Sequence, residues 1–243
     1  MALSYGRLPD HTSHKKVIFI CQYETPSSGD AIVFLMSSAP NVVIIDSGVG
    51  NHTSVKNAFG ILGVHVTITS DAEVLAAATH LVLPGVGSFQ EGMEGLQKRK
   101  LPEVLKSIVV EKHMPILGIC LGMQLLASEG FEHGHFQGLG LIPGKVIELE
   151  AAQKGLHLPH IGWNDVRVSA SHRITQGFSH DPIFYFVHSY HLVPENTAVI
   201  AGTCDYGVNF AAIVEKGNIF GAQFHPEKSH SDGMQILKNF LSI

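Results

Sequence analysis

The stretch Gly118-Ile119-Cys120-Leu121-Gly122 follows the apolar run Pro115-Ile116-Leu117 and precedes a helix-like segment at residues 123–127. A nucleophile between two glycines at a strand-to-helix junction is typical of the nucleophile elbow, here with Cys as the nucleophile. The glycines are needed because the turn leaves no room for side chains on either flank. Such a turn lifts the sulfur over the N-terminus of the following helix, whose partial positive charge favours the thiolate. The alternative interpretation is a buried structural cysteine in a tight β–α turn.

Strands and helices alternate along the chain up to this elbow. Residues 41–46 form a continuous apolar run, as expected of a strand that is buried on both faces. We predict further strands at 65–69, 80–83 and 115–119, and helices at 54–62, 71–78 and, as one or two segments, 89–110. This alternation predicts an α/β fold with a doubly wound, mostly parallel sheet and helices on both faces. The ligand site of such a sheet lies beyond the carboxyl ends of its strands, where Cys120 and the loop Pro84–Gly87 both belong.

After Gly130 the pattern changes to glycines and short apolar segments. We predict strands at 145–149, 165–168, 183–187, 198–203, 210–215 and 218–224, and a closing helix at 234–241. Short strands separated by turn residues are typical of hairpins. The C-terminal half is therefore expected to add antiparallel strands to the parallel core.

The composition is that of an ordinary globular protein. Hydrophobic residues make up 45% of the 243 residues, and the formal net charge is −5. This acidic balance offers no basic face to nucleic acid or an anionic membrane, and no apolar run reaches the roughly 18–20 residues of a membrane-spanning helix. Three cysteines form no disulfide framework, which indicates a reducing, cytoplasmic setting. None of the histidine pairs stands beside cysteine or carboxylate ligands at zinc-site spacing, so we expect no metal.

Residues 1–40 differ from the rest of the chain. They combine short apolar segments with a turn-rich centre at 25–30, and none of them carries recognisable chemistry. We predict a poorly ordered N-terminal extension at 1–40, with an accessory hairpin as the alternative, and a functional domain at 41–243.

A second candidate group follows the predicted strand at 218–224. His225-Pro226-Glu227 places a base beside an acid that can orient it, and Pro226 fixes the backbone between them. Cys120, His225 and Glu227 together supply the nucleophile, base and carboxylate of a catalytic triad, whose members are recognised by role rather than by sequence order. Taken singly, His225 is compatible with a core or capping histidine and Glu227 with a solvated turn. Their combination with the elbow favours catalysis.

Several longer motifs accompany these residues in order. They are Pro84-Gly85-Val86-Gly87, Gly118 to Gln124, Pro159-His160-Ile161-Gly162-Trp163-Asn164, Tyr185 to Tyr190, and Gln223 to Ser229. Through them the chain resembles the class I (triad) glutamine amidotransferase family, and within it the glutaminase subunits of imidazole glycerol phosphate synthase. The likeness runs from about residue 41 to the C-terminus. Ile161 stands where the family pattern leads us to expect Met, which is a small change of apolar shape.

The resemblance implies the following chemistry. Cys120 attacks the side-chain amide of glutamine, His225 moves the proton and Glu227 holds the imidazole. The oxyanion donors are the N–H of Leu121 and one from Val86-Gly87. The family pattern also implies residues that hold the charged ends of glutamine, namely Gln124, Glu132, His188, Ser189 and Tyr190. No cofactor and no metal are implied.

The resemblance further implies that ammonia passes to a separate cyclase, a (β/α)₈ barrel that makes imidazole glycerol phosphate and aminoimidazole carboxamide ribotide for histidine biosynthesis. This chain is too short to contain that barrel, so we expect a heterodimer with a cyclase subunit, with His160, Trp163 and Asn164 at the interface. Three alternatives stay open: a glutaminase for another acceptor synthase, a peptidase or chaperone of the related cysteine-elbow superfamily, and a non-catalytic binding subunit.

Overall fold

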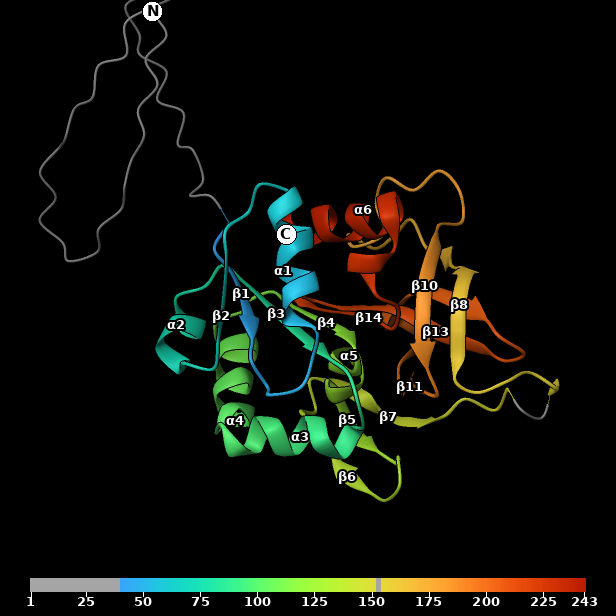
Figure 1. The fold of residues 1–243 in the computed structure, drawn as a ribbon, viewed down its shortest axis with the longest axis horizontal. Helices are drawn as coiled ribbons and strands as arrows, with labels where there is room; N and C mark the ends of the chain where they lie inside the picture. Colours follow the sequence, from blue (N-terminus) through green and yellow to red (C-terminus); the bar gives the residue numbers. More distant parts are fainter. Residues whose placement is uncertain (1–39, 152–153) are drawn as a thin grey trace, which may run out of the picture. The chain divides into compact units, whose positions relative to one another are not determined.

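The structure is a computed structural model that describes residues 40–151 and 154–243 (Figure 1). Except for Pro40, the predicted N-terminal extension lies outside the described residues. The extension and the domain boundary at residue 41 therefore stay predictions.

An eight-stranded sheet with the order β2-β1-β3-β4-β14-β13-β12-β9 forms the centre of the domain (Figure 1). Five neighbouring strands are parallel: β2 (Val66–Thr69), β1 (Val42–Ile45), β3 (His80–Gly85), β4 (Ile116–Cys120) and β14 (Ile219–Ala222). Three antiparallel strands extend this core: β13 (Asn209–Lys216), β12 (Ile200–Asp205) and β9 (Arg167–Val168). The predicted parallel core with added antiparallel strands is confirmed.

Helices cover both faces of the sheet. One face packs against α1 (His52–Ile61) and α6 (His230–Leu241). The other packs against α2 (Ala72–Ala76), α3 (Phe89–Lys98), α4 (Leu101–Lys106) and the π-helical turn η1 (Ser107–Glu111) that continues α4. Successive strand side chains point to opposite faces, so the apolar run of β1 fills two cores, with Val43 and Ile45 on one face and Val42 and Ile44 on the other.

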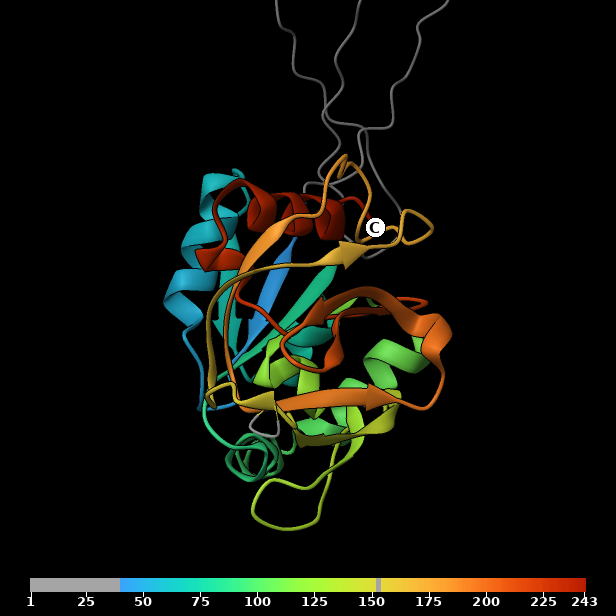
Figure 2. The ribbon, with the colours of Figure 1, turned by 90° about the vertical axis from the view of Figure 1, so that its right-hand side faces the viewer.

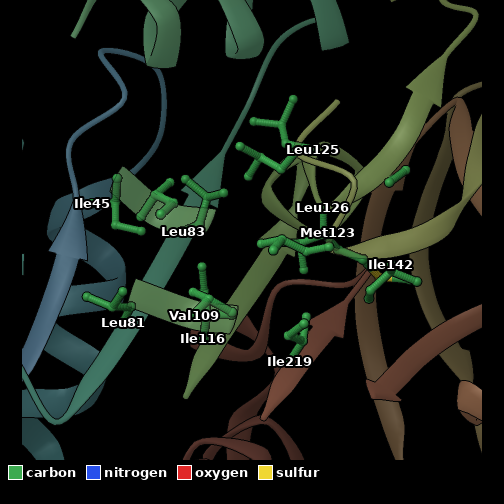
Figure 3. Close-up of a cluster of buried hydrophobic side chains, with 14 of the residues drawn as sticks. Ile45, Leu81, Leu83, Val109, Ile116, Met123, Leu125, Leu126, Ile142 and Ile219 are labelled. Carbon is green, nitrogen blue, oxygen red and sulfur yellow. The ribbon is translucent and has the colours of Figure 1, made fainter. Parts of the chain in front are cut away.

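The short helix α5 (Leu121–Leu125) follows β4 directly and is fixed by the core beneath it. Figure 3 shows Met123 and Leu125 of α5 in one apolar cluster with Ile45, Leu81 and Leu83 of the neighbouring strands. All five side chains are 0% exposed in this cluster. The turn that carries Cys120 is thus clamped between a buried strand and a buried helix.

Side-chain caps define where the longer connections become helical. Asn51 accepts from the N–H of Ser54 at the start of α1, and Asp71 accepts from two N–H groups at the start of α2. Ser88 and Glu91 form a capping box at the start of α3. This capping box ends the Pro84–Gly87 loop, so the loop is held at both ends.

A four-stranded sheet in the order β11-β7-β5-β6 lies next to α5 and was only partly predicted. Its strands are β5 (Ala127–Gly130), β6 (Phe136–Gln137), β7 (Ile142–Glu148) and β11 (Tyr190–Pro194). The prediction of a helix through residue 127 is wrong, because the helix ends at Leu125. The N–H groups of Leu139 and Ile142 donate to the carbonyls of Leu125 and Leu126, so the returning chain takes the acceptors that a longer helix would need.

The third sheet is an antiparallel pair, β8 (His160–Asp165) and β10 (Ile183–His188). It packs on the same side as α6, as the view in Figure 2 shows. We predicted one strand at 165–168, where the structure has the end of β8 followed by the separate strand β9. Short 3₁₀ turns at η3 (Thr197–Val199) and η4 (Pro226–Lys228) complete the chain before α6.

Candidate active site

Cys120 has the strained backbone of a nucleophile elbow. Its φ is +54° and its ψ is −113°, a conformation that costs of order 1–3 kcal/mol in a residue other than glycine. Tight packing keeps it there. A Cβ on Gly122 would lie 1.7 Å from the carbonyl oxygen of Leu83, and a Cβ on Gly118 would lie 2.6 Å from that of Gly122. Both glycines are therefore required by close backbone contacts.

Strand register brings the neighbouring segments to Cys120. In the β3–β4 pair, Gly85 is level with Cys120, so Val86 and Gly87 continue beside the elbow. In the β14–β4 pair, Ala222 is level with Ile119. Residues 223–225 therefore leave β14 on the other side of the sulfur, which explains how His225 reaches a cysteine about a hundred positions earlier.

His225 and Glu227 form a buried pair. Nδ1 of His225 lies 2.8 Å from Oε1 of Glu227, and the two side chains are 3% and 1% exposed. The backbone around His225 is anchored, because its N–H donates to the Tyr185 carbonyl and its own carbonyl accepts from Ser229 Oγ. Among the described residues, no hydrogen-bond partner is found for Nε2 of His225. The imidazole is thus held by one nitrogen and presents the other.

The environment of His225 favours its charged form. Burial by itself lowers the pKa of the imidazole, but Cys120 and Glu227 together outweigh burial and raise this pKa to about 9. It is the thiolate of Cys120 that raises this pKa, as the acceptor that faces Nε2–H and as a negative charge. Among the described residues, no hydrogen bond of normal geometry yet joins Sγ to Nε2. Catalytic hydrogen bonds are often long without substrate and shorten when it binds.

The sulfur of Cys120 has two further polar neighbours. Sγ lies 3.8 Å from the carbonyl oxygen of Val187 and 3.9 Å from Nε2 of Gln223. The helix that follows has only five residues, so it offers the free N–H groups of a first turn rather than the dipole of a long helix. The dipole that we expected to favour the thiolate is correspondingly small.

A cavity of about 330 Å³ opens above the sulfur. Its lining includes every residue that the sequence proposed for catalysis, the oxyanion or the substrate, except Glu227, which lies behind His225. The lining residues are Val86, Gly87, Cys120, Leu121, Gln124, Glu132, Pro159, Val187, His188, Ser189, Tyr190 and His225. The volume falls at the small end of the range of ligand pockets, as suits a single amino acid.

Gln124 and Glu132 are both tied to the wall of this cavity. Gln124 Nε2 donates to the carbonyl of Tyr190 at 2.8 Å and to Oε1 of Gln223 at 3.2 Å. Glu132 Oε2 accepts from the N–H of Phe89 at 2.6 Å. Each side chain is therefore oriented before any ligand arrives.

Two histidines beside the cavity are buried and neutral. Burial lowers the pKa of His188 to about 3 and that of His160 to about 4. His188 Nδ1 lies 2.9 Å from the Tyr190 carbonyl, and its Nε2 lies 3.1 Å from Nδ1 of His160. His160 is only 2% exposed, with its ring stacked on Phe186 and Tyr206. The expectation that the His160 side chain lies at a partner interface is not supported, because it points into the core.

The two other proposed interface residues are accessible. Trp163 is 47% exposed and stacks on His230, and Asn164 is half-buried and donates from Nδ2 to the carbonyl of Asp205. Both lie on β8, as does the 59% exposed Ile161. Successive side chains of β8 point to opposite faces of the strand, so His160 points inward while Ile161 and Trp163 point outward.

Sequence reasoning assigned no role to three residues at the site: Pro159, Val187 and Gln223. All three lie inside the longer motifs of the sequence, but their local patterns carry no functional signal. Gln223 is 0% exposed although it is polar. The signal that could have found it is the register of two parallel strands, since Gln223 follows the strand beside the elbow.

Neither a metal centre nor a membrane-spanning helix is found in the described part of the chain. Between residues 40 and 243, leaving out 152–153, no group of three or more His, Cys, Asp or Glu side chains is placed to hold a metal ion. Over the same residues, no helix is long and apolar enough to cross a membrane.

Comparison with known proteins agrees with this geometry. Residues 43–243 match the family model described as glutamine amidotransferase class-I. The chain is 45% identical over 199 residues to imidazole glycerol phosphate synthase subunit HisH of Moorella thermoacetica, covering 82% of this chain and 93% of that protein. It is also 45% identical over 204 residues to the subunit of the same name in Syntrophotalea carbinolica, covering 82% and 98%.

Solved structures with the same fold are more distant in sequence. The structure of PurLQS from Thermotoga maritima aligns with a TM-score of 0.66 and 21% identity, covering 84% of this chain and 98% of that chain. The crystal structure of a glutamine amidotransferase from Thermotoga maritima aligns with a TM-score of 0.59 and 16% identity, covering 85% and 82%. The elbow, the buried His–Glu pair, the family match and the relatives agree, and this chain belongs to the class I glutamine amidotransferase family, in which it groups with the HisH subunits of imidazole glycerol phosphate synthase.

Proposed function

We propose that this chain hydrolyses glutamine to glutamate and supplies the ammonia to a separate cyclase subunit, which makes imidazole glycerol phosphate and aminoimidazole carboxamide ribotide in histidine biosynthesis. The observation that carries the proposal is the convergence of Cys120, His225 and Glu227 beside one amino-acid-sized cavity. The relatives' names, which call them subunits of imidazole glycerol phosphate synthase, support the choice of acceptor.

The proposed reaction begins from a protonated His225 beside the thiolate of Cys120. With its pKa raised to about 9, the imidazole is protonated near neutral pH, and the proton comes from the thiol of Cys120. The thiolate attacks the side-chain amide carbon of glutamine. Nε2–H of His225 then gives its proton to the departing nitrogen, and ammonia leaves. Water gives a proton to the now neutral His225 and attacks the glutamyl thioester, which releases glutamate and restores the Cys120 thiolate beside the protonated imidazole.

The oxyanion that forms at the amide oxygen needs N–H donors. The N–H of Leu121 starts the helix after the nucleophile, and the Val86–Gly87 segment runs beside it because Gly85 is level with Cys120. Gly87 has a φ of +94°, a conformation that favours glycine, so this peptide can turn its N–H toward or away from the cavity at little cost. We assign the oxyanion donors to Leu121 and to this segment.

The cavity also offers groups of the right charge for an amino acid. Glu132 supplies a carboxylate for the α-ammonium group, and it is already anchored to Phe89 N–H. Gln124 and the backbone of His188, Ser189 and Tyr190 line the rest of the wall. We assign substrate binding to these five residues.

We propose that the cyclase docks on the exposed face of the β8–β10 pair. This face, here called the β8–β10 face, carries the side chains of Ile161, Trp163, Ile183, Tyr185 and Val187. Trp163 is level with Tyr185 and Ile161 with Val187, whereas Ile183 is level with Asp165. Ile161, Trp163 and Ile183 are 59%, 47% and 45% exposed, an apolar group typical of a protein interface. Val187 also lines the cavity, so a partner on this face would sit close to the released ammonia.

Cys120→Ala in the complex with the cyclase tests the proposal. Glutamine-dependent synthesis should fall at least ~10⁴-fold, because the nucleophile is gone, whereas synthesis from added ammonia should persist. Cys204→Ala is the matched control. This second buried thiol, whose pKa burial raises to about 12, should be dispensable for both activities. Glutamine hydrolysis retained in Cys120→Ala would refute the mechanism.

A second measurement concerns the partner. We expect the chain alone to be a poor glutaminase and its hydrolysis rate to rise about 10²–10³-fold when the cyclase is bound and loaded, the range that one oxyanion donor is worth. A partner can drive such a change only by binding the active arrangement more tightly. Equal rates with and without the cyclase would contradict this part. The absence of any gain with this cyclase, together with a gain from another synthase, would indicate a different acceptor.

The sparse cysteines of the sequence favour the cytoplasm as the compartment of this protein.

A further inference from the structure

The carbonyl oxygen of Tyr190 fixes the hydrogen positions of the surrounding polar side chains. It lies 2.9 Å from His188 Nδ1 and 2.8 Å from Gln124 Nε2. A carbonyl can only accept, so both partners must present an N–H to it. Nε2 of His188 is then an acceptor in the neutral ring, and His160 Nδ1 must be the donor toward it.

The same logic leads from Gln124 to Cys120. One hydrogen of the Gln124 amide is used by Tyr190, and the other points at Gln223 Oε1, 3.2 Å away. Gln223 therefore presents its oxygen to Gln124 and its NH₂ group to the sulfur of Cys120, at 3.9 Å. Gln124 and Gln223 are 4% and 0% exposed, and buried amide groups of this kind are almost always hydrogen-bonded.

The backbone holds Gln223 in this position. Its N–H donates to the carbonyl of Ala212 on β13, and the preceding Ala222 is level with Ile119 on β4. The side chain therefore leaves the sheet next to Cys120. The side chain of Gln223 is held at its backbone and at Oε1, so its NH₂ group can bond the sulfur without a further loss of side-chain freedom.

The two forms of Cys120 use different neighbours. The thiol can donate to the Val187 carbonyl, 3.8 Å from Sγ. Once its proton has moved to Nε2 of His225, the sulfur can only accept, and the N–H of Gln223 becomes its donor. Hydrogen bonds to a charged acceptor are shorter and stronger than those to a neutral one, so this contact tightens in the thiolate form.

We propose that Gln223 is a positioning residue that holds the thiolate of Cys120 and, through its oxygen, fixes the orientation of the Gln124 amide. This role rests on the proposed function of Cys120 as the nucleophile. A single buried amide thereby joins the nucleophile to the substrate-binding wall at Tyr190, so that both are aligned before glutamine enters.

The test is the rate at which iodoacetamide alkylates Cys120 as a function of pH, followed by mass spectrometry of the peptide that carries it. In Gln223→Met, which keeps the volume but removes the N–H, the rate at pH 7 should fall about tenfold and the midpoint of the profile should rise by about one pH unit. Gln223→Asn keeps an amide but is one methylene too short to reach both partners, and should show a smaller shift in the same direction. Gln235→Met, at a glutamine that bonds Asn239 in α6, is the matched control and should leave the profile unchanged.

Steady-state kinetics of the complex supply a second readout. Gln223→Met should lower kcat and also raise KM for glutamine, because both Cys120 and Gln124 lose their support, whereas ammonia-dependent synthesis should be unaffected. Gln223→Asn serves the same measurements if the Met variant does not fold. Unchanged alkylation profiles in a folded Gln223 variant would overturn the proposal.

The same experiment separates this proposal from the proposed function. Cys204 is the internal reference, because its buried thiol has a pKa raised to about 12 and should react slowly. If Cys120 of the unmodified chain reacts no faster than Cys204, the assignment of Cys120 as the nucleophile is refuted. If Cys120 reacts quickly and the Gln223 variants match it, only the role of Gln223 is refuted.

Discussion

His225 is bonded through Nδ1 to Oε1 of Glu227 at 2.8 Å, and both side chains are almost completely buried. Burial lowers the pKa of an imidazole, yet the pKa of His225 is raised to about 9 because Cys120 and Glu227 outweigh burial. The protonated imidazole contributes stability that is fully present below about pH 6.5, the ordinary pKa, and is lost as the pH rises through about 9. In the proposed reaction the leaving nitrogen takes its proton from this ring, so activity should also be lost as the pH rises through about 9.

Glu227→Gln should shift the upper limit of the active pH range downward. Without the carboxylate charge, burial acts on His225 with less opposition, and the pKa of its imidazole should fall well below 9. We expect kcat for glutamine hydrolysis to drop about 10²–10⁴-fold near neutral pH. The measurement is kcat between pH 6 and 10 for the complex. Glu103→Gln, which removes a carboxylate that is 85% exposed, is the control and should change neither quantity. An unshifted upper limit in Glu227→Gln would show that Glu227 does not set the protonation of His225.

Mild acid should destabilise the fold through three buried histidines. Burial lowers the pKa of His188 to about 3 and those of His160 and His191 to about 4. The unfolded chain then binds more protons below pH 6.5, so the free energy of unfolding decreases as pH falls. The expected loss between pH 7 and pH 5 is roughly 2 kcal/mol per histidine. Urea titrations at the two pH values measure it. His191→Leu removes one titrating ring and should reduce the difference by about 2 kcal/mol; the same difference in both chains would contradict the assignment.

Two glycine substitutions should have opposite effects. Gly122→Ala places a Cβ 1.7 Å from the Leu83 carbonyl oxygen, and backbone on both sides has to move. We expect a loss of about 3 kcal/mol or more in the free energy of unfolding, together with loss of the elbow. Gly60→Ala, near the end of α1 with nothing within 4 Å, should instead stabilise the domain by about 0.5–1 kcal/mol. Equal effects of the two changes would mean that the elbow is not packed as described.

Trp163→Ala should weaken association with the cyclase. Trp163 is the largest side chain of the β8–β10 face, and an aromatic anchor at the centre of an interface is worth about 2 kcal/mol or more, close to thirtyfold in Kd. Binding of the purified subunits, followed by titration calorimetry, gives the value. Ile61→Ala, which truncates a 78% exposed side chain on α1, is the control and should leave Kd unchanged. If the two variants bind equally well, the interface lies elsewhere.

Much of the fold was predictable because its signals are local. Buried parallel strands read as continuous apolar runs, and caps such as Ser88 with Glu91 lie within one turn of the helix that they start. The elbow is local as well, since Gly118 and Gly122 flank the cysteine whose turn requires them. The end of α5 was not predictable in this way. It depends on N–H groups of Leu139 and Ile142, which return only after a hairpin.

The sequence alone picked out the candidate reactive groups, Cys120, His225 and Glu227, and the alternation of elements that carries them to one edge of a parallel sheet. Only the tertiary structure decided which groups surround them. It put the polar Gln223 in the core beside the sulfur and turned His160 inward against Phe186, so that Trp163 alone of the two rings remains exposed. The physical reason is that a side chain's protonation, burial and partners are set by atoms from strands far apart in the chain, whereas a residue pattern records only its own neighbours.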